Sequence, residues 1–118
     1  MKNTRQIGAH YEELIAEYLQ RQGYKIVERN FYCRQGEIDL IAVDDPYLVF
    51  IEVKYRTKYT AGHPLEAVGL KKQKKISRTA VYYCYSHKIP DTHPCRFDVV
   101  SILNGQIEHI KNAFELYP

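Results

Sequence analysis

Two acidic residues and a lysine interrupt the most apolar part of this sequence. Asp39 lies in the segment GEIDLIAV, and Glu52 and Lys54 lie in the segment LVFIEVK. Residues two apart on a strand share a face, so Glu52 and Lys54 would point to the same side. Carboxylates on an apolar sheet lose hydration, which is costly unless a cation joins them or one of them takes a proton. A hard divalent cation, Mg²⁺ or Mn²⁺, would meet that need.

The segments 37–43 and 47–54 are predicted to be the two strands of a hairpin. Both are apolar, and the Asp-Asp-Pro sequence at 44–46 is typical of a tight turn. Strands that are apolar on each face require helices on both sides of the sheet. Alternation would place Ile38, Leu40 and Ala42 on one face, and Ile41 and Val43 on the other.

The register of this hairpin decides which charged side chains are neighbours. With the turn centred just before Pro46, Asp39 faces Glu52 and is predicted to share a metal ion with it. In the same register Glu37 faces Lys54, and directly opposed residues have Cβ atoms about 5 Å apart. Lys54 would orient or deprotonate water, or stabilise charge on a scissile phosphate. Alternatively, these charges only end the strands at the surface, with Glu37 paired to Lys54.

Apolar periodicity and turn residues predict the other elements. Spacings of three and four indicate one helix that ends before Gly23 and another that starts at Pro64. The Asn-Gly sequence at 104–105 is typical of a two-residue turn between strands. The predicted fold is α/β in the order αβββαββ, with helices at 7–19 and 64–85 and strands at 24–31, 37–43, 47–54, 96–103 and 106–110.

Length and composition limit the class of protein. With 118 residues, 45% of them hydrophobic, the chain has room for one domain, which we take as residues 1–118. Three cysteines without a CxxC pair argue against a disulfide framework and for a reducing compartment, so the cytoplasm is expected. No stretch approaches the roughly 20 apolar residues of a membrane span, and the polar start lacks the apolar segment of a signal peptide.

The positive charge is concentrated in one segment. Residues 54–88 contain nine Lys or Arg and one acidic residue, a net charge of +8, whereas the rest of the chain carries −5. This segregation suggests a polyanion partner, with a solvated helix face as an equal alternative. Contacts to phosphate position a nucleic acid without reading its sequence, so selectivity for structure is expected. The predicted nucleic-acid-binding residues are Arg56, Lys58, Lys71, Lys72, Gln73, Lys74, Lys75 and Arg78.

Two tyrosines, Tyr55 and Tyr59, lie among these basic residues directly after Lys54. Aromatic rings of this kind stack on unpaired bases or pack against sugars. Packing within the protein is the alternative, and it is favoured for Tyr55, which would lie on the face opposite Lys54.

An Asp on one strand followed by Glu-x-Lys on the next resembles the signature of the PD-(D/E)XK nuclease-like superfamily. Here the pattern stands as Asp39 and Glu52-Val53-Lys54. More closely, the chain resembles the YraN-like family of small bacterial proteins over nearly its whole length. The motifs that carry this resemblance are GEIDLI (36–41), FIEVK (50–54), EAV (66–68), KQ (72–73) and RFDVV (96–100).

The resemblance implies a restriction-endonuclease-like core, a mixed central sheet flanked by helices, related to Holliday-junction resolvases. In resolvase-like members a glutamate on the first helix joins the site, and Glu12 is the matching residue here, with a solvated helical glutamate as an equal alternative. Glu37 is a further candidate for the site. The chain departs from the family pattern at Tyr11, where relatives have a glycine.

Three functions are compatible with these features. The first is a Mg²⁺-dependent endonuclease that hydrolyses phosphodiester bonds in branched or single-stranded DNA, with DNA preferred over RNA and a homodimer as a possible assembly. The second is a non-catalytic nucleic-acid-binding module in a larger assembly, because a fold does not establish activity. The third is a structural partner whose basic side meets an acidic protein. Asp98 has no assigned mechanistic role and is interpreted as structural.

Overall fold

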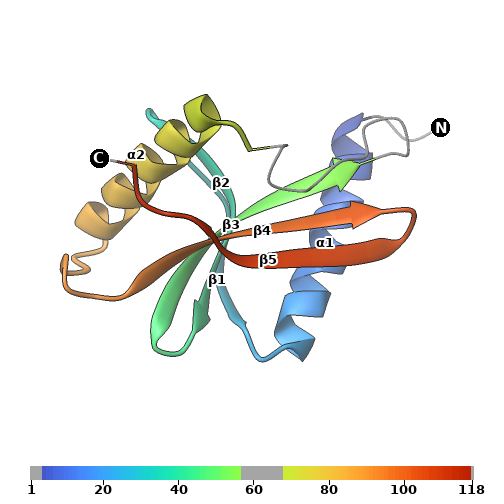
Figure 1. Cartoon of the computed structure of the whole chain (residues 1–118), viewed down its shortest axis with the longest axis horizontal. Coiled ribbons are helices and arrows are strands. Elements are labelled where there is room, and N and C mark those ends of the chain that lie inside the picture. The colour runs from blue at the N-terminus through green and yellow to red at the C-terminus, as the bar shows by residue number, and fades with distance from the viewer. Residues whose placement is uncertain (1–3, 57–67, 118) are drawn as a thin grey trace.

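The computed structural model describes residues 4–56 and 68–117, which form an α/β structure with two helices packed on a mixed sheet (Figure 1). The predicted order αβββαββ is confirmed. The elements in chain order are α1 (Thr4–Arg21), β1 (Lys25–Cys33), β2 (Gly36–Asp44), β3 (Tyr47–Arg56), α2 (Leu70–Ser86), β4 (Cys95–Leu103) and β5 (Gln106–Phe114).

Neighbouring strands in the sheet follow the order of the sequence, β1-β2-β3-β4-β5. β3 and β4 run parallel, whereas the other neighbours run antiparallel. Parallel neighbours need a long crossover connection, and here that connection contains α2. The predicted mixed sheet is therefore observed in the described part of the chain.

The helices cover opposite faces of the sheet, as the apolar strands predict (Figure 1). Phe50 of β3 belongs to the cluster under α2, and its neighbours Val49 and Ile51 belong to the cluster under α1. All three side chains are at most 2% exposed. Because alternate side chains of a strand point to opposite faces, β3 contributes to both hydrophobic cores and is packed on both sides.

Ile38 departs from the predicted alternation. The sequence pattern places it on the face of Leu40, but it packs with Ile41 in the cluster under α2. Arg29↔Leu40 and Phe31↔Ile38 pair in one register, but the β1 backbone is irregular between them, because Asn30 has a left-handed φ of 53°. Asp39 lies at this irregularity, between the two residues whose side chains take opposite faces.

α1 ends at a glycine, as predicted. Gly23 has a φ of 96°, a left-handed conformation that costs glycine little. The N–H of Tyr24 then donates to the Leu19 carbonyl at 2.9 Å, which satisfies one of the last helical carbonyls. The helix is longer at both ends than the predicted 7–19.

α2 begins at Leu70, so the predicted continuous helix from Pro64 is wrong. Gly69 has an extended backbone, with φ −72° and ψ 172°, and a residue in that conformation cannot continue a helix. Pro64 itself lies outside the described residues. In the described ranges, neither α1 nor α2 combines the length and the apolarity that a membrane-crossing helix requires.

β4 and β5 are joined by the predicted Asn-Gly turn. Asn104 and Gly105 both have positive φ, 51° and 78°, as a tight hairpin turn of the primed type requires. β5 continues to Phe114, so the predicted end at residue 110 is too early. Phe114 stacks on Phe97 with ring centroids 5.0 Å apart, a contact between strands that the local pattern does not reveal.

Candidate functional site

β2 and β3 separate partway along their length. They pair in the predicted register as far as Leu40↔Ile51. Beyond that pair β2 continues beside β1 and β3 continues beside β4, so the two strands diverge (Figure 1). Asp39 and Glu52 are the first residues past the last pair, and we call this point the fork.

Asp39 is held by the backbone of the neighbouring strand. Its Oδ2 accepts a hydrogen bond of 2.8 Å from the N–H of Val53, and the residue is 9% exposed. In a continuous hairpin the Val53 N–H would donate to a backbone carbonyl of β2, and here the Asp39 carboxylate accepts that hydrogen bond instead. The predicted direct opposition of Asp39 and Glu52 is replaced by a side chain inserted where the strands part.

Glu52 lies beside two ammonium groups. It is 6% exposed, and its Oε1 is 3.5 Å from Nζ of Lys54 and 3.5 Å from Nζ of Lys72. Lys54 shares its strand and face, as the sequence predicts. Lys72 reaches Glu52 from the first turn of α2, a contact that local sequence could not predict because it depends on how α2 packs on the sheet.

Burial and like charges raise the pKa of Asp39 from its ordinary value of 3.8 to about 7. Loss of hydration is the largest cause, the negative charge of Glu52 is the next, and the hydrogen bond from Val53 acts in the opposite direction. Among the described residues, the lysines at the fork pair with Glu52 and not with Asp39. The charged form of Asp39 is therefore poorly compensated.

Glu12 brings a further carboxylate from α1. Burial raises its pKa, a hydrogen bond from Asn30 lowers it, and the charges of Glu37 and Glu52 raise it. The charge of Glu12 in turn raises the pKa of Asp39. The structure therefore places Glu12 within electrostatic range of the fork, half-buried rather than fully solvated.

Glu37 does not pair with Lys54, so that predicted cross-strand neighbour is wrong. Its partner is Tyr32 of β1, because β2 has already left β3 at this position. Glu37 is exposed, but its charge still contributes to the raised pKa of Asp39. It lies at the margin of the fork.

A complete metal site is not preformed in the described residues. Within residues 4–56 and 68–117, no group of three or more His, Cys, Asp or Glu side chains is arranged to hold an ion. Asp39 and Glu52 are the two buried carboxylates at the fork, and they remain the candidate ligands.

The region that contains the fork is also the region shared with known proteins. The profile of the "Uncharacterised protein family UPF0102" matches residues 11–102, which include Glu12, Asp39, Glu52 and Lys54. The chain belongs to the UPF0102 family. A UPF0102 protein of Lachnoclostridium phytofermentans is 49% identical over 115 residues, or 98% of each chain. A UPF0102 protein of Clostridium botulinum is 43% identical over 119 residues, which cover 96% of this chain and 97% of the relative. A UPF0102 protein of Coxiella burnetii is 44% identical over 114 residues, which cover 96% of this chain and 95% of the relative. The predicted resemblance to a family of small bacterial proteins is confirmed, whereas the PD-(D/E)XK superfamily stays a prediction.

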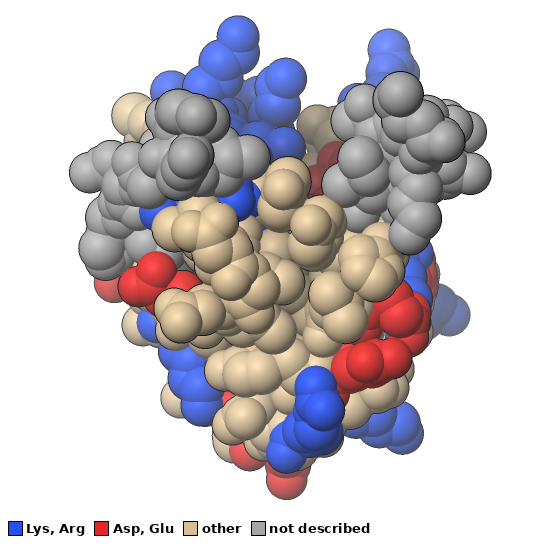
Figure 2. All heavy atoms as spheres, turned by 90° about the vertical axis from the view of Figure 1, so that its right-hand side faces the viewer, with Lys and Arg blue, Asp and Glu red and all other residues tan. Residues whose placement is uncertain are grey.

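Three basic residues follow one side of α2. Lys71, Lys75 and Arg78 are exposed and are spaced by four and three residues, as a helical ridge requires. Figure 2 views the side of the molecule where α1 starts and β3 ends, and it shows Lys and Arg side chains along both the upper and the lower edge of a largely uncharged centre. The basic ridge lies on the same helix that brings Lys72 to Glu52 at the fork.

The other residues predicted to contact nucleic acid have different surroundings. Arg56 is only 7% exposed, so its burial does not suit a surface contact to phosphate. Gln73 donates through Nε2 to a backbone carbonyl just before α2 at 2.9 Å, which stabilises the entry to the helix. Lys74 Nζ lies 4.8 Å from the centre of the Tyr117 ring. Lys58 lies outside the described residues.

Tyr11 of α1 and Tyr55 of β3 stack beside the fork, each next in sequence to a charged residue of the site. Their ring centroids are 4.2 Å apart and the planes are inclined by 12°. The expected packing of Tyr55 is observed, although 49% of the residue stays exposed. Tyr11 thus supplies the ring on which Tyr55 packs.

Asp98, for which the sequence indicates no role, lies at the centre of a buried polar network. The side chain is fully buried and makes its contacts on the face of the sheet away from α2. Arg96 precedes it by two residues on the same face, a signal that the sequence contains. The other contacts join distant segments, so only folding brings them together. Its partners are Arg96 Nε at 2.9 Å, His109 Nε2 at 2.7 Å, the Asn112 N–H at 3.0 Å and the Tyr24 hydroxyl at 3.0 Å.

Proposed function

We propose that this protein is a divalent-metal-dependent endonuclease that hydrolyses phosphodiester bonds in branched or single-stranded DNA. The observation that carries the proposal is the pair of buried carboxylates, Asp39 and Glu52, at the fork, with Lys54 3.5 Å from Glu52. The Asp and Glu-x-Lys pattern resembles that of the PD-(D/E)XK superfamily. A mixed sheet with a helix on each face is compatible with the restriction-endonuclease-like core that this resemblance implies.

The donor set at the fork suits Mg²⁺ or Mn²⁺. Mg²⁺ is commonly bound by one or two carboxylates, with water and substrate phosphate as its other ligands, so Asp39 and Glu52 suffice as protein ligands. Burial and the charge of Glu52 raise the pKa of Asp39 to about 7, so a cation beside both carboxylates would stabilise their charged forms. A bound divalent ion would supply positive charge and Lewis acidity to the scissile phosphate.

The protein's own residues have distinct parts in this proposal. The Val53 N–H fixes the orientation of Asp39, so the carboxylate needs little reorganisation on binding. The Lys54 side chain is 28% exposed, so its ammonium could meet a phosphate oxygen and would stabilise the negative charge that develops there. Lys72 adds a second positive charge from α2.

The surroundings of the fork favour a substrate chosen by shape rather than by sequence. The exposed ridge of Lys71, Lys75 and Arg78 can neutralise backbone phosphates, which carry no sequence information. The half-exposed Tyr55 ring offers a surface on which an unpaired base can stack. Both features suit branched or single-stranded DNA more than a uniform duplex.

Cleavage of a labelled panel tests the proposal directly. Duplex, single-stranded, flap and four-way-junction DNA would be incubated with Mg²⁺ or Mn²⁺ and the full chain. We expect metal-dependent cutting of the structured substrates, and a loss of at least about 100-fold in Asp39→Asn, Glu52→Gln and Lys54→Met, because each removes a ligand or a charge stabiliser. The same variants should still bind DNA.

Matched substitutions separate the fork from general charge effects. Glu108→Gln changes an exposed glutamate on β5, and Lys25→Met changes an exposed lysine on β1, so both should cut like the wild type. Equal losses in these controls, or cutting that persists in all three fork variants, would contradict the proposal.

A non-catalytic DNA-binding module is the second candidate. The observation that favours it is that two lysine ammonium groups already compensate the negative charge of Glu52. It predicts salt-dependent binding of the same panel with no cutting under either metal. Lys71→Glu, which reverses charge on the ridge, would weaken binding in both cases and so serves as a positive control for the DNA contact.

A further inference from the structure

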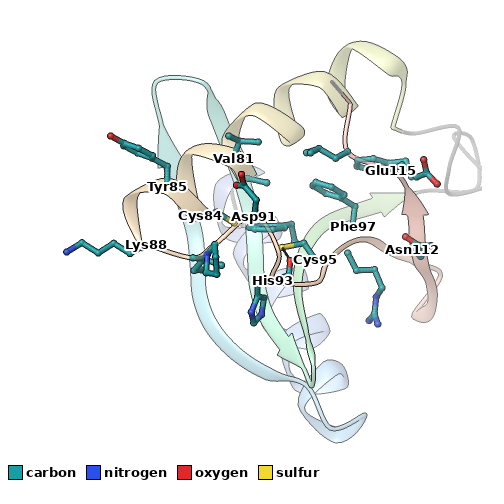
Figure 3. Close-up of a pocket in the computed structure, with 17 residues that line it drawn as sticks. Val81, Cys84, Tyr85, Lys88, Asp91, His93, Cys95, Phe97, Asn112 and Glu115 are labelled. Carbon is teal, nitrogen blue, oxygen red and sulfur yellow. Dashed lines mark hydrogen bonds between the residues drawn. The ribbon is translucent and has the colours of Figure 1, made fainter.

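A cavity lies at the other end of α2, away from the fork. It has a volume of about 740 Å³ and is enclosed by the last turns of α2, the loop that follows, the start of β4 and the end of β5 (Figure 3). Phe50, Phe97 and Phe114 contribute to an apolar floor. A cavity of this size is within the range that accommodates small molecules.

Two of the three cysteines line this cavity. Cys84 comes from the last turn of α2 and Cys95 from the first residue of β4, and Figure 3 shows both directed into the same space, whereas Tyr85 and Lys88 extend away from it. The two thiols are close enough for each to shift the pKa of the other, and Cys95 Sγ also donates to the His93 carbonyl at 3.6 Å. Cys95 is exposed and Cys84 is half-buried against the core, so a reagent in the cavity meets Cys95 first.

The contact makes the two thiols unequal. The hydrogen bond from Cys84 lowers the pKa of Cys95 to about 7, although burial acts in the opposite direction. The same hydrogen bond, together with burial, raises the pKa of Cys84. The thiolate is the nucleophilic form of cysteine, so near neutral pH Cys95 is the reactive member and Cys84 is its donor.

We propose that Cys95 is a modification site for small disulfides that enter this cavity, and that Cys84 resolves the adduct into an intramolecular Cys84–Cys95 disulfide. Both residues line one space and influence each other's pKa, and they come from different elements, the helix α2 and the strand β4. The disulfide would join the end of α2 to the start of β4 across the wall of the cavity.

The reaction proceeds in two exchanges of a thiolate with a disulfide. The Cys95 thiolate attacks one sulfur of a small disulfide R–S–S–R, a Cys95–S–S–R bond forms, and the first R–S⁻ leaves and takes up a proton. Cys84 then loses its proton and attacks the Cys95 sulfur, so that the bond to R–S breaks and a second R–SH is released. Two protein thiols are oxidised while one small disulfide is reduced to two thiols.

Cys84 becomes competent for the second step through the first. Its raised pKa depends chiefly on the hydrogen bond it donates to Cys95. Once Cys95 is capped by R–S, it no longer carries a thiolate, and that effect on Cys84 disappears. The order of the two attacks is therefore built into the contact.

Cys33 provides an internal control. It lies at the end of β1, is partly exposed, and donates to Oε1 of Gln35 at 3.3 Å, outside the cavity. Cys33 thus differs from Cys95 in two respects, because it is less exposed and, in the described part of the chain, has no second thiol beside it. We expect Cys95 to react roughly tenfold faster than Cys33 with a small electrophile.

Exposure of the full chain to oxidised glutathione, followed by iodoacetamide and peptide mass spectrometry, tests the proposal. The wild type should lose two alkylation sites and yield a peptide pair linked through Cys84 and Cys95. Cys84→Ser should accumulate one glutathione adduct at Cys95, because resolution is blocked. Cys95→Ser should leave Cys84 alkylated, and Cys33→Ser should behave as the wild type.

Three results would overturn the proposal. These are equal rates of modification at Cys33 and Cys95, an adduct on Cys95 in the wild type that is never resolved, and no adduct on Cys95 in Cys84→Ser. Cys84→Ala is the second variant at the buried position, and unchanged circular dichroism and thermal midpoint of each variant exclude unfolding as the cause of any change in reactivity.

Discussion

Two buried aspartates in the same sheet have opposite electrostatic states. Asp39 on β2 is 9% exposed and its pKa is raised to about 7, whereas Asp98 on β4 is 1% exposed and its pKa is lowered to about 2. Burial raises the pKa of both carboxyl groups. Burial alone therefore does not explain the difference.

The partners of the two carboxylates decide the outcome. Asp98 is contacted by His109, Arg96 and the Asn112 N–H, and these contacts together outweigh the effect of burial. Asp39 accepts a single backbone hydrogen bond and faces the charge of Glu52. A compensated carboxylate stabilises the fold, whereas an uncompensated one costs stability and is suited to bind a cation.

Asp98→Asn is expected to have the largest effect. An amide cannot compensate Arg96 and His109, whose side chains are 11% and 5% exposed, so buried donors lose their charged partner. We expect the free energy of unfolding to fall by about 3–5 kcal/mol, measured by urea denaturation at pH 7. Asp91→Asn, in the exposed loop before β4, is the control and should change it by less than about 0.5 kcal/mol. A loss as small as that of the control would show that Asp98 is not the centre of the network.

Asp39→Asn is expected to act in the opposite direction. The amide removes the repulsion from Glu52 while its oxygen can still accept the hydrogen bond from Val53. We expect the free energy of unfolding at pH 8 to rise by about 1–3 kcal/mol. The same denaturation experiment measures it, and a clear destabilisation would contradict the uncompensated state of Asp39.

The pH dependence of stability should differ in sign between the two aspartates. The folded-state pKa of Asp39 lies above its ordinary value of 3.8, so its stabilising contribution is complete below that value and is lost as pH rises toward about 7. Between pH 5 and 6.5 we expect the free energy of unfolding of the wild type to fall, relative to Asp39→Asn, by about 1.4 kcal/mol per pH unit. Thermal or urea unfolding across this range, in the absence of divalent ions, measures the difference.

Asp98 should show the reverse trend in acid. Its folded-state pKa lies below the ordinary value, so its contribution is complete above about pH 4 and is lost as pH falls through about 2. If the free energy of unfolding changed with pH equally in the wild type and in Asp39→Asn between pH 5 and 6.5, the predicted difference between Asp39 and Asp98 would be wrong.

Tyr24→Phe is expected to have the smallest effect. The hydroxyl donates to Asp98 Oδ2 at 3.0 Å, and its removal leaves the other partners of that carboxylate in place. We expect the free energy of unfolding to fall by about 1 kcal/mol, measured by urea denaturation. An effect as large as that of Asp98→Asn would mean that the network depends on the tyrosine rather than on the charged pair.

Much of the fold follows from local patterns in the chain. The turn at Pro46 and the apolar segments around it predict the register that ends at Leu40↔Ile51, because a tight turn leaves few ways to pair two strands. The left-handed glycine at Gly23 and the Asn-Gly turn are likewise local. The motif residues predict the family for the same reason, since they depend on sequence order alone.

The errors arise where local pattern and packing disagree. Ile38 takes the unexpected face at the point where the β1 backbone becomes irregular, with a left-handed Asn30 between the partners of Ile38 and Leu40. Glu37 lies beside β1 rather than Lys54 because the two strands part at the fork. Neither the irregularity nor the divergence has a sequence signature as strong as a turn or a helix cap.

The sequence by itself determined the order of the elements, the register of the hairpin and the residues Asp39, Glu52 and Lys54, since all of these depend on neighbours along the chain. Only the tertiary structure decided that β2 and β3 diverge at Asp39, that Lys72 reaches Glu52 from α2, and that Asp98 is compensated while Asp39 is not. The physical reason is that the charge state of a buried carboxylate depends on partners from distant segments, and those partners meet only when the helices pack on the sheet.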